Sequence, residues 1–509
     1  MADDPAWAKE EGTTESPITA EKKTLEETKD ADAPMSLLEQ KRSMKAIDHP
    51  PEIDRNPLKF PDLAFGIAWI VSVVGMIYVA IAYGAQDVSD KAEEYDDDEK
   101  QAALEHLTKI LILVFLFALF CAQMSMSVMM RCGGFMIHVG LIGINAFLIV
   151  SGVIFIEYTY WYCGVFLILV GLCGCLFHFY IRANIAFASA CLHVGCEVVM
   201  DFPLLEVAAF AVSVLGVLFF FTFGVACYGY YNYQQDKEDD DEDEQARLTI
   251  VIFVFLFIFF WTQQVFKYII TAMTADTAQT WWYGLEHTGH PALNALGRTT
   301  TYHLGSIAFG AFFVALIETI VAIINYLRRE AEKCPGGCCV SCVLWFVTCC
   351  LKCCESILDY MNKYAFIYVG IHGYSYLYAG KQVCALFATQ GMTAVASDFF
   401  IEMIFFFFSV GIGLASAALG VAIVEYGPDD WSEGINQAEV VVGLLCGVGG
   451  YFVAHTVYAL VEAANKSAFI LFVENPHILE HTHEDDFNRL SRVWHMLGKE
   501  VKDEDKSPA

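Results

Sequence analysis

Charged side chains are scarce in this sequence. Asp, Glu, Lys and Arg make up 18% of its 509 residues, whereas soluble domains usually carry about 25%. The charges gather in the two tails and in a few short runs, and long apolar stretches lie between them. An apolar helix of about 20 residues crosses a hydrocarbon core roughly 30 Å thick. The sequence therefore predicts an all-α, polytopic integral membrane protein in contact with the lipid bilayer.

Basic residues and enzyme signatures are also lacking. The sequence has 30 Lys and Arg against 60 Asp and Glu, and its net charge is -30. It therefore lacks the basic surface of a nucleic-acid-binding protein. It has no GxxxxGK(S/T) phosphate loop, no HExxH zinc motif and no GxSxG nucleophile motif. We predict no enzymatic activity, no cofactor, no metal centre and no nucleic-acid partner.

The first 60 residues lack the apolar core of a signal peptide. They are polar and rich in Glu and Lys, so we expect residues 1–60 to form a disordered cytoplasmic tail. Lys and Arg gather before the first apolar stretch and after the last one, which predicts that both termini are cytoplasmic. This assigns residues 61–473 to a transmembrane helical domain and residues 474–509 to a cytoplasmic C-terminal tail.

The hydropathy pattern predicts about ten transmembrane helices, an even number that fits two cytoplasmic termini. The predicted crossings are 62–84, 107–130, 134–156, 159–180, 204–232, 248–275, 300–327, 364–390, 398–424 and 438–472. Residues 181–202 are interrupted by Arg182, His193, Glu197 and Asp201. We interpret them as an amphipathic helix at the membrane interface, with an eleventh crossing as the alternative.

Eight cysteines lie between Cys334 and Cys354. We interpret segment 334–354 as an amphipathic helix resting on the membrane. Its two C-x-x-C pairs have zinc-ligand spacing, and S-acylation or disulfide formation are further alternatives. The C-terminal tail holds a second candidate cluster, in which His477, His481 and His483 precede three acidic residues. A solvated tail is the simpler interpretation, and a divalent metal site is the alternative.

Polar side chains inside apolar spans are costly in lipid and usually face a bundle interior or a water-filled path. Glu318, Glu402 and Gln264 are such residues, and Glu318 lies deepest in its apolar stretch. A structural alternative for Glu318 is an interhelical hydrogen bond or an ion pair with Lys267. The aromatic candidates that have polar neighbours are Trp261, Tyr268, Tyr302, Tyr374 and Tyr378.

These residue types suit an organic cation. A quaternary ammonium group has no N–H to donate, and it is bound by aromatic ring faces with a carboxylate nearby. We therefore predict that Trp261, Tyr268, Tyr374 and Tyr378 hold an ammonium group, and that Glu318 or Glu402 balances its charge. For any single aromatic side chain, the alternative is a position facing lipid or in the interfacial belt.

Residues 302–311, YHLGSIAFGA, resemble the YHLGSLAFGA signature of the choline transporter-like family (solute carrier family 44). Segments 260–283, 349–373 and 449–475 resemble further family blocks in the same order. The resemblance implies about ten helices, cytoplasmic termini and transport of choline or ethanolamine. The sequence departs from the family in its short first loop and in Asn465-Lys466-Ser467, where the final helix usually carries an Asp-Thr pair.

The sequence thus predicts a carrier for small organic cations that works by facilitated or alternating-access transport. We expect it in the plasma membrane, with an organelle membrane as the alternative. A membrane scaffold or complex subunit that does not transport is the second functional hypothesis. A polar cavity between the spans would favour the carrier, whereas a solid apolar bundle would favour the scaffold.

Overall fold

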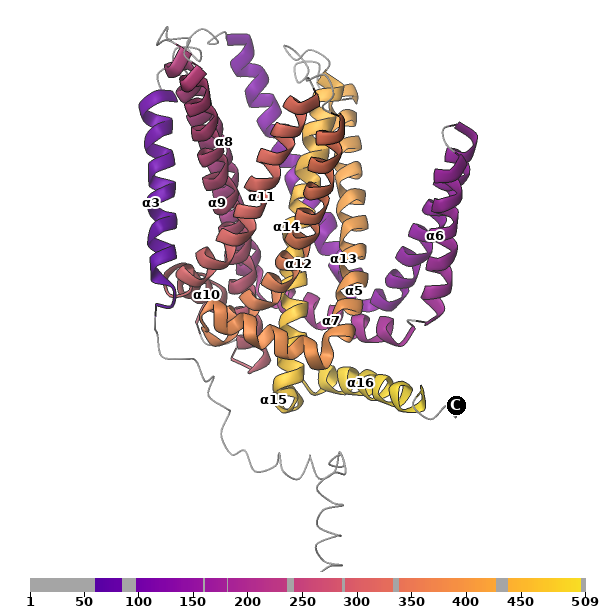
Figure 1. Cartoon of the computed structure of the whole chain (residues 1–509). Coiled ribbons are helices and arrows are strands. Elements are labelled where there is room, and N and C mark those ends of the chain that lie inside the picture. Colours follow the sequence, from indigo (N-terminus) through magenta and orange to yellow (C-terminus); the bar gives the residue numbers. More distant parts are fainter. Residues whose placement is uncertain are drawn as a thin grey trace, which may run out of the picture. The chain divides into compact units, whose positions relative to one another are not determined.

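The computed structural model describes residues 60–84, 98–158, 161–180, 182–235, 242–285, 289–332, 338–426 and 438–504. The described residues are almost entirely helical and contain no strand (Figure 1). Nine of their helices are long and apolar enough to cross a membrane. The predicted all-α, polytopic membrane architecture is confirmed. The predicted tail 1–60 lies outside the described residues except for Phe60.

The first crossing is α3 (Leu63–Val79), which continues as the π-helical turn η1 (Ala80–Gly84). The next helix, α5 (Asp98–Tyr158), has 61 residues, and its backbone leaves helical geometry at Cys132. A straight helix of that length would measure about 90 Å, roughly three times the hydrocarbon core. The break at Cys132 separates the two crossings predicted at 107–130 and 134–156. Counting its two arms separately gives ten crossings.

Eleven more helices complete the described chain. The second arm of α5 packs against α6 (Trp161–Tyr180). The other long helices are α8 (Pro203–Gln235), α9 (Glu242–Trp282), α11 (Leu304–Glu332), α12 (Cys338–His372), α13 (Tyr376–Tyr426) and α14 (Ala438–Glu474). The shorter ones are α7 (Arg182–Asp201), α10 (Pro291–Thr301), α15 (Pro476–Thr482) and α16 (Glu484–Glu504).

The predicted crossing at 364–390 is wrong. The helices long and apolar enough to cross here are Cys339–His372 in α12 and Ser397–Tyr426 in α13. Between these helices Gly373 adopts φ 69°, a left-handed conformation that glycine reaches without a steric penalty. The turn at Gly373 therefore divides the stretch that hydropathy alone joined into one span.

The described part of the Cys-rich segment forms the first half of the candidate span Cys339–His372, which favours a membrane-crossing helix over the helix on the membrane surface considered from sequence. Its thiol groups and the apolar VLWFV run between them are lipophilic enough to span. The cysteines described there are free and exposed on the helix surface. Within the described part of the chain they form neither a disulfide nor a group with metal-binding geometry.

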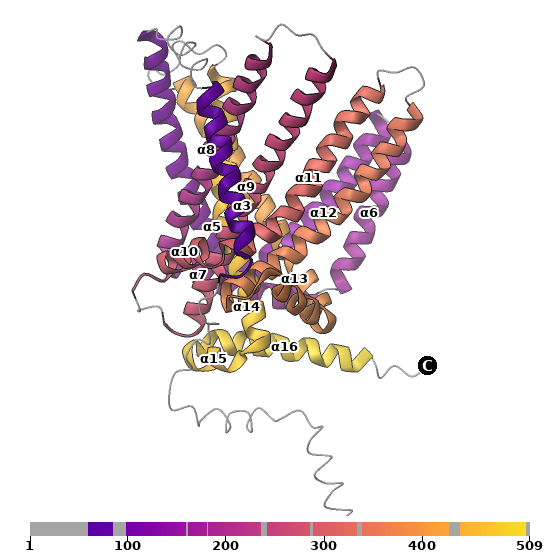
Figure 2. The same cartoon turned by 60° about the vertical axis from the view of Figure 1, so that its left-hand side comes forward.

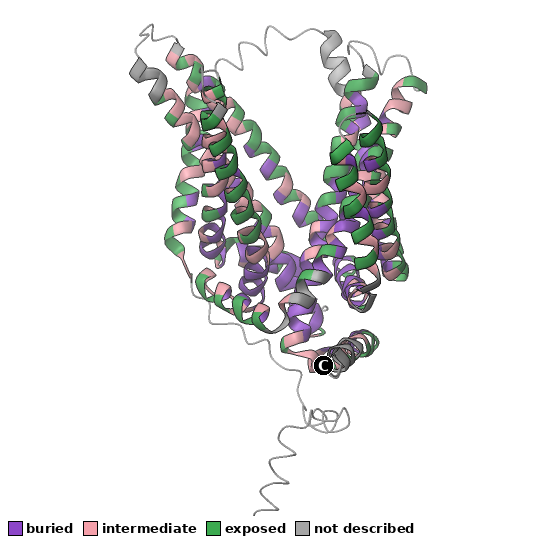
Figure 3. Ribbon diagram, turned by 45° about the vertical axis from the view of Figure 1, so that its right-hand side comes forward, coloured by how far each residue is buried: buried purple, intermediate pink, exposed green. Residues whose placement is uncertain are grey.

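The described ends of the chain, at Phe60 and Glu504, lie at the same end of the helices (Figures 1 and 2). The short helices α7, α10, α15 and α16 also lie at this end, which we call the inner end. Buried residues concentrate there, and the long helices diverge toward the opposite end (Figure 3). Two ends on one side agree with an even number of crossings.

Helix α7 is not among the described helices that are long and apolar enough to span, in agreement with the interfacial helix predicted at residues 181–202. It packs against α5, α13 and α14 on one side and against α16 on the other. Phe187, Leu192 and Val199 are fully buried as a result. The short apolar stretch is therefore covered by protein at the inner end.

Two glycines of the YHLGSIAFGA motif allow helices to approach closely. A side chain at Gly305 would meet the backbone of Pro61 and Asp62, before α3. The neighbouring Ser306 donates its hydroxyl to Asp62 Oδ2 at 2.9 Å, and the same oxygen accepts the Tyr376 N–H at 3.1 Å. Asp62 thus joins the first turns of α3, α11 and α13.

The second glycine, Gly310, lies against the rings of Phe366 and Tyr376, where a Cβ would clash with both. It brings α11 against α12 and the start of α13. The motif therefore marks the packing centre of the inner half of the helix bundle.

Candidate functional site

A pocket of about 650 Å³ lies between α8, α9, α12 and α14. Four phenylalanine rings line it, those of Phe220, Phe259, Phe266 and Phe452. Its polar lining includes Lys267, Lys363, His455, Glu462 and Lys466. All of these residues belong to helix segments that can span the membrane. Charged groups at such positions are expensive unless they are paired or reach water, and they commonly mark a solute pathway.

Lys466 is the centre of the charged wall, and only 1% of its surface is exposed. Its Nζ lies 2.5 Å from Glu462 Oε1, one turn earlier on α14. The same ammonium lies 3.1 Å from Glu402 Oε1 and 3.7 Å from Asp398 Oδ2, both on α13. A buried ammonium needs compensating partners of this kind to remain charged.

Lys363 on α12 shares two of these acids. Its Nζ is 2.8 Å from Glu462 Oε1 and 3.1 Å from Glu402 Oε1. Two ammonium groups are therefore held by the same two carboxylates.

Two tyrosines complete the surroundings of Lys466. Asp398 Oδ2 accepts the Tyr360 hydroxyl at 3.0 Å and the Tyr364 hydroxyl at 2.6 Å. The ring centroids of these tyrosines lie 6.0 and 5.9 Å from Lys466 Nζ. At about 6 Å a ring face still attracts a cation. Carboxylates and aromatic rings thus surround the ammonium group of Lys466, whereas the prediction from sequence concerned a substrate ammonium group and other aromatic residues.

A further lysine reaches the pocket from α9. Lys267 Nζ lies 2.6 Å from Asp359 Oδ1, which also accepts the Tyr268 hydroxyl at 2.6 Å. Asp359 precedes Lys363 by one turn of α12. We call Lys267, Lys363, Lys466, Asp359, Asp398, Glu402 and Glu462 the lysine network. It has three ammonium and four carboxylate groups, so when fully ionised it carries one excess negative charge.

Two of the predicted site residues belong to this region. Glu402 is in the lysine network, and Tyr268 is hydrogen-bonded to it through Asp359. Gln264 and Glu318 bind each other, with Gln264 Nε2 2.7 Å from Glu318 Oε1. This is the interhelical hydrogen bond considered as the structural alternative for Glu318. Lys267, the other partner considered there, is paired with Asp359.

The remaining predicted residues lie in separate settings. Trp261 is buried and donates its indole N–H to the Ala308 carbonyl at 2.9 Å, so it joins α9 to α11. Tyr302 follows α10, and its ring lies 5.1 Å from that of Phe60. Tyr374 and Tyr378 contact each other, with centroids 4.7 Å apart, at the junction of α12 and α13. The four aromatic residues predicted to hold an ammonium group, Trp261, Tyr268, Tyr374 and Tyr378, are therefore not gathered around one site.

The sequence did not indicate site roles for Lys363, Tyr360, Tyr364 and Asp359. Lys466 stood out only as a departure from the family pattern. The misplaced crossing at 364–390 put Asp359 and Lys363 outside the membrane. A usable signal was present, because Glu462 and Lys466 lie four residues apart, a spacing that pairs side chains on one helical face.

A family profile described as "Plasma-membrane choline transporter" matches residues 164–477, well over half of the chain. The chain belongs to this family. The matched range includes every residue of the lysine network. The match confirms the resemblance read from the YHLGSIAFGA motif.

Individual relatives in the plasma-membrane choline transporter family are distant. Protein PNS1 of Mycosarcoma maydis is 24% identical over 246 residues, which are 46% of this chain and 44% of the relative. Protein PNS1 of Cryptococcus neoformans is 24% identical over 347 residues, 66% of this chain and 62% of the relative. Choline transporter-like protein 5 of Macaca fascicularis is 25% identical over 200 residues, 36% of this chain and 26% of the relative. The chain thus spans less than half the length of the first of these.

Proposed function

We propose that this protein carries small organic cations, choline or ethanolamine, across the plasma membrane by alternating access. The observation that supports this most directly is the lysine network: its three lysines and Glu462 line the pocket, and Asp359, Asp398 and Glu402 pair with those lysines. One excess negative charge between membrane-spanning helices matches one monovalent cation. A charged pocket of this kind favours the carrier hypothesis over the scaffold, for which we expected a solid apolar bundle.

The pocket offers an organic cation both of the features that it needs. The phenylalanine rings at positions 220, 259, 266 and 452 provide apolar and aromatic surface for methyl groups. Glu462 lies on the same lining and provides the opposite charge. Glu462 is paired with Lys466 and Lys363 in the empty pocket, so its attraction for a substrate depends on release of a lysine. At about 5 Å, and with an effective dielectric constant of about 20, a carboxylate freed from its lysine partners would attract a cation by about 3 kcal/mol. That is roughly a 200-fold preference for a cation over a neutral molecule of the same shape.

Lys466 has a defined role in this proposal. Its ammonium group occupies the acidic, aromatic surroundings while the pocket is empty. A substrate ammonium group that enters beside Glu462 competes with Lys466 for that carboxylate and leaves Lys466 with Asp398 and Glu402. Substrate binding would therefore break an ion pair within α14 and leave Lys466 held only by carboxylates of α13, a change at the contact between these two helices.

The arrangement of the helices supports an outward-facing state. Buried packing by α7 and its neighbours closes the inner end, and the long helices diverge at the opposite end (Figure 3). In the inward-facing state the contacts at the inner end would open, and those at the outer end would form. The lysine network lies toward the inner end of its spans, where this change would take place.

The test is uptake of radiolabelled choline into liposomes that contain purified protein. Unlabelled choline and ethanolamine serve as competitors. We expect saturable uptake that both competitors reduce. Folded, correctly inserted protein that gives no uptake above empty liposomes would reject the carrier and favour the scaffold.

Variants test whether the lysine network forms the site. Glu462→Gln should lower uptake at least tenfold, and Glu402→Gln should lower it as well. Glu425→Gln changes an exposed acid near the end of α13 and serves as the matched control. Glu318→Gln should also abolish uptake without changing surface expression if Glu318 balances substrate charge. Retained uptake in Glu318→Gln would assign this residue to packing through Gln264.

A further inference from the structure

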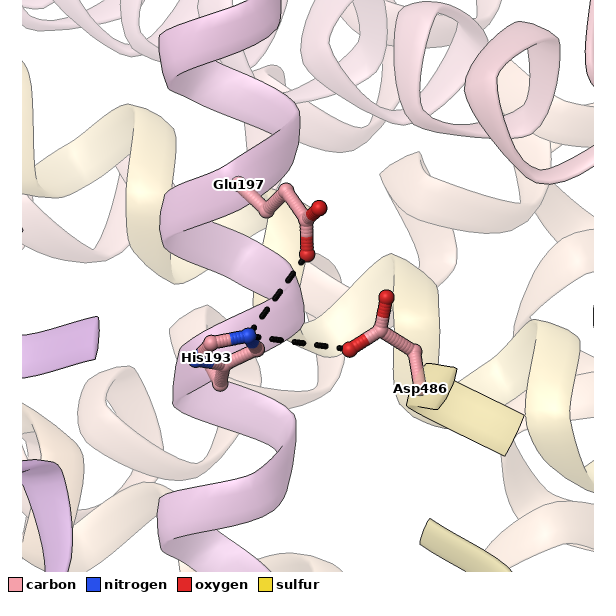
Figure 4. Close-up of side chains that lie close together, drawn as sticks. All are labelled: His193, Glu197 and Asp486. Carbon is pink, nitrogen blue, oxygen red and sulfur yellow. Dashed lines mark ion pairs between the residues drawn. The ribbon is translucent and has the colours of Figure 1, made fainter. Parts of the chain in front are cut away.

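A second polar cluster lies at the inner end, where α16 packs against α7. His193 and Glu197 are one turn apart on α7, and Asp486 lies in the first turn of α16. The three side chains converge from the two helices (Figure 4). His193 Nε2 is 3.7 Å from Glu197 Oε2 and 3.7 Å from Asp486 Oδ1. All three potential ligand atoms lie within 4.8 Å of one another.

The hydrogen bond of the other ring nitrogen of His193 determines whether Nε2 carries a hydrogen or a lone pair. His193 Nδ1 lies 3.0 Å from the Met130 carbonyl oxygen, which can only accept a hydrogen bond, so Nδ1 carries the hydrogen. In the neutral imidazole, Nε2 then directs its lone pair toward the two carboxylates. Three acceptors face one another as a result. Glu197 Oε2 is buried and has no hydrogen-bond partner within the described part of the chain.

We propose that His193, Glu197 and Asp486 bind a divalent cation, for which zinc fits best. One imidazole nitrogen and two carboxylate oxygens are an ordinary zinc ligand set, and a fourth position would remain for water. Zinc–ligand bonds of about 2.1 Å in a tetrahedron place neighbouring ligand atoms roughly 3.4 Å apart. The separations of 3.7 Å need only a small side-chain adjustment to reach this. The Met130 carbonyl would act as the second-shell acceptor that orients a metal-bound histidine.

The partial burial of the three side chains favours a specific binding site over an accidental contact between exposed groups. The Asp486 side chain is 8% exposed, His193 is 20% exposed and Glu197 is 33% exposed. By contrast, His481 and Asp485 are exposed. The group with ligand geometry includes Asp486 of the tail and none of the tail histidines considered from sequence. The structure selects one acid from the tail and pairs it with two residues of α7, which are nearly 300 residues away in the chain.

The cation would fasten α16 to the inner end. Leu490 is fully buried, and the Trp494 ring lies 5.4 Å from that of Phe187 on α7 and 5.7 Å from that of Phe472 on α14. This apolar contact holds the middle of α16, and a metal at Asp486 would hold its first turn. Because α7 also packs against α5, α13 and α14, the metal would stabilise the closed inner end. This inference does not depend on which solute the protein carries.

The experiment uses the full chain in detergent, with accessible cysteines blocked by N-ethylmaleimide and metals removed by a chelator. Zinc chloride is then added, and bound zinc is measured after equilibrium dialysis. Wild-type protein is compared with Asp486→Asn and with its neighbour Asp485→Asn. His193→Ala is compared with His481→Ala. Size-exclusion chromatography confirms that each variant is folded.

We expect the wild type and both controls to bind about one zinc ion per chain. Asp486→Asn and His193→Ala should bind zinc at least tenfold more weakly. Zinc should also slow trypsin cleavage at Arg489 and Arg492 in the wild type and the controls, but not in these two variants. The inference is overturned if the wild type binds no zinc, or if Asp485→Asn and His481→Ala lose as much zinc as the ligand variants.

Discussion

Replacing Lys466 by methionine should destabilise the protein more than any other lysine replacement in the lysine network. Lys466 Nζ contacts Glu462, Glu402 and Asp398, and the residue is 1% exposed. Removing one partner of a buried ion pair costs about 3–5 kcal/mol, because the other charge is left uncompensated. Lys363 still pairs with Glu462 and Glu402 in the variant, so Asp398 bears most of the loss. We therefore expect a cost near the lower limit, about 3 kcal/mol.

A second substitution shows whether this cost comes from charge. Lys466→Met gives the network two excess negative charges, and Lys466→Met combined with Asp398→Asn returns it to one. The double variant should recover about 1–3 kcal/mol relative to the sum of the single variants, a coupling typical of directly interacting residues. Lys363→Met should cost less than Lys466→Met, because Lys363 is 21% exposed and Lys466 still holds both shared acids.

The assay is equilibrium unfolding in mixed detergent and SDS micelles, followed by tryptophan fluorescence. Lys381→Met is the matched control, since Lys381 is an exposed lysine on α13 and its loss should change the free energy of unfolding by less than about 0.5 kcal/mol. Strict additivity of Lys466→Met and Asp398→Asn would refute the reasoning. So would a Lys466→Met variant as stable as Lys381→Met.

Three further predictions concern packing and thiol reactivity. Gly310→Leu should prevent recovery of folded protein, because a side chain there would overlap the Phe366 and Tyr376 rings. Gly380→Leu is the control, since a Cβ at Gly380 has no neighbouring atom within 4 Å, and this variant should fold normally. Size-exclusion chromatography measures the recovery of both variants. Asp62→Ala should lower the free energy of unfolding by about 1–3 kcal/mol, since the Ser306 hydroxyl and Tyr376 N–H lose their acceptor; an unchanged value would contradict the role given to Asp62. Burial raises the pKa of the Cys196 thiol to about 12. At pH 7 maleimide should therefore label exposed Cys132 and leave Cys196 unmodified until SDS unfolds the protein, as mapped by mass spectrometry. Equal labelling of the two cysteines would show that α7 is accessible to the reagent.

Hydropathy predicted most of the fold because lipid imposes one simple requirement, a long apolar helix for each crossing. It separated the two arms of α5, although the structure joins them into one helix with a break at Cys132. It failed at 364–390 because the turn depends on the φ angle of Gly373, and hydrophobicity carries no information about that angle. The Cys-rich segment allowed several interpretations from sequence, because the same apolar residues suit a helix on the membrane surface and a helix that crosses it.

The chemistry of the candidate site could be predicted better than its residues. Carboxylates and aromatic rings were expected around a substrate ammonium group, and the structure has them around Lys466, with Glu402 among the carboxylates. Which tyrosines face the cation depends on how α12 is rotated against α14, and this is set by packing between distant segments. Likewise, no local pattern indicates that Asp486 meets His193, since α7 and α16 are joined only by the tertiary fold.

The sharing of Glu402 and Glu462 between two lysines has a consequence for how easily the structure can switch. When each acid has a single partner, exchanging partners requires a bare charge in a poorly solvated place. Here each acid keeps one lysine while the other lysine leaves, so pairing can change without passing through an isolated ion. Such degenerate pairing lowers the barrier between alternative arrangements of α12, α13 and α14. The same redundancy that makes the charges tolerable in the membrane would allow these helices to slide past one another.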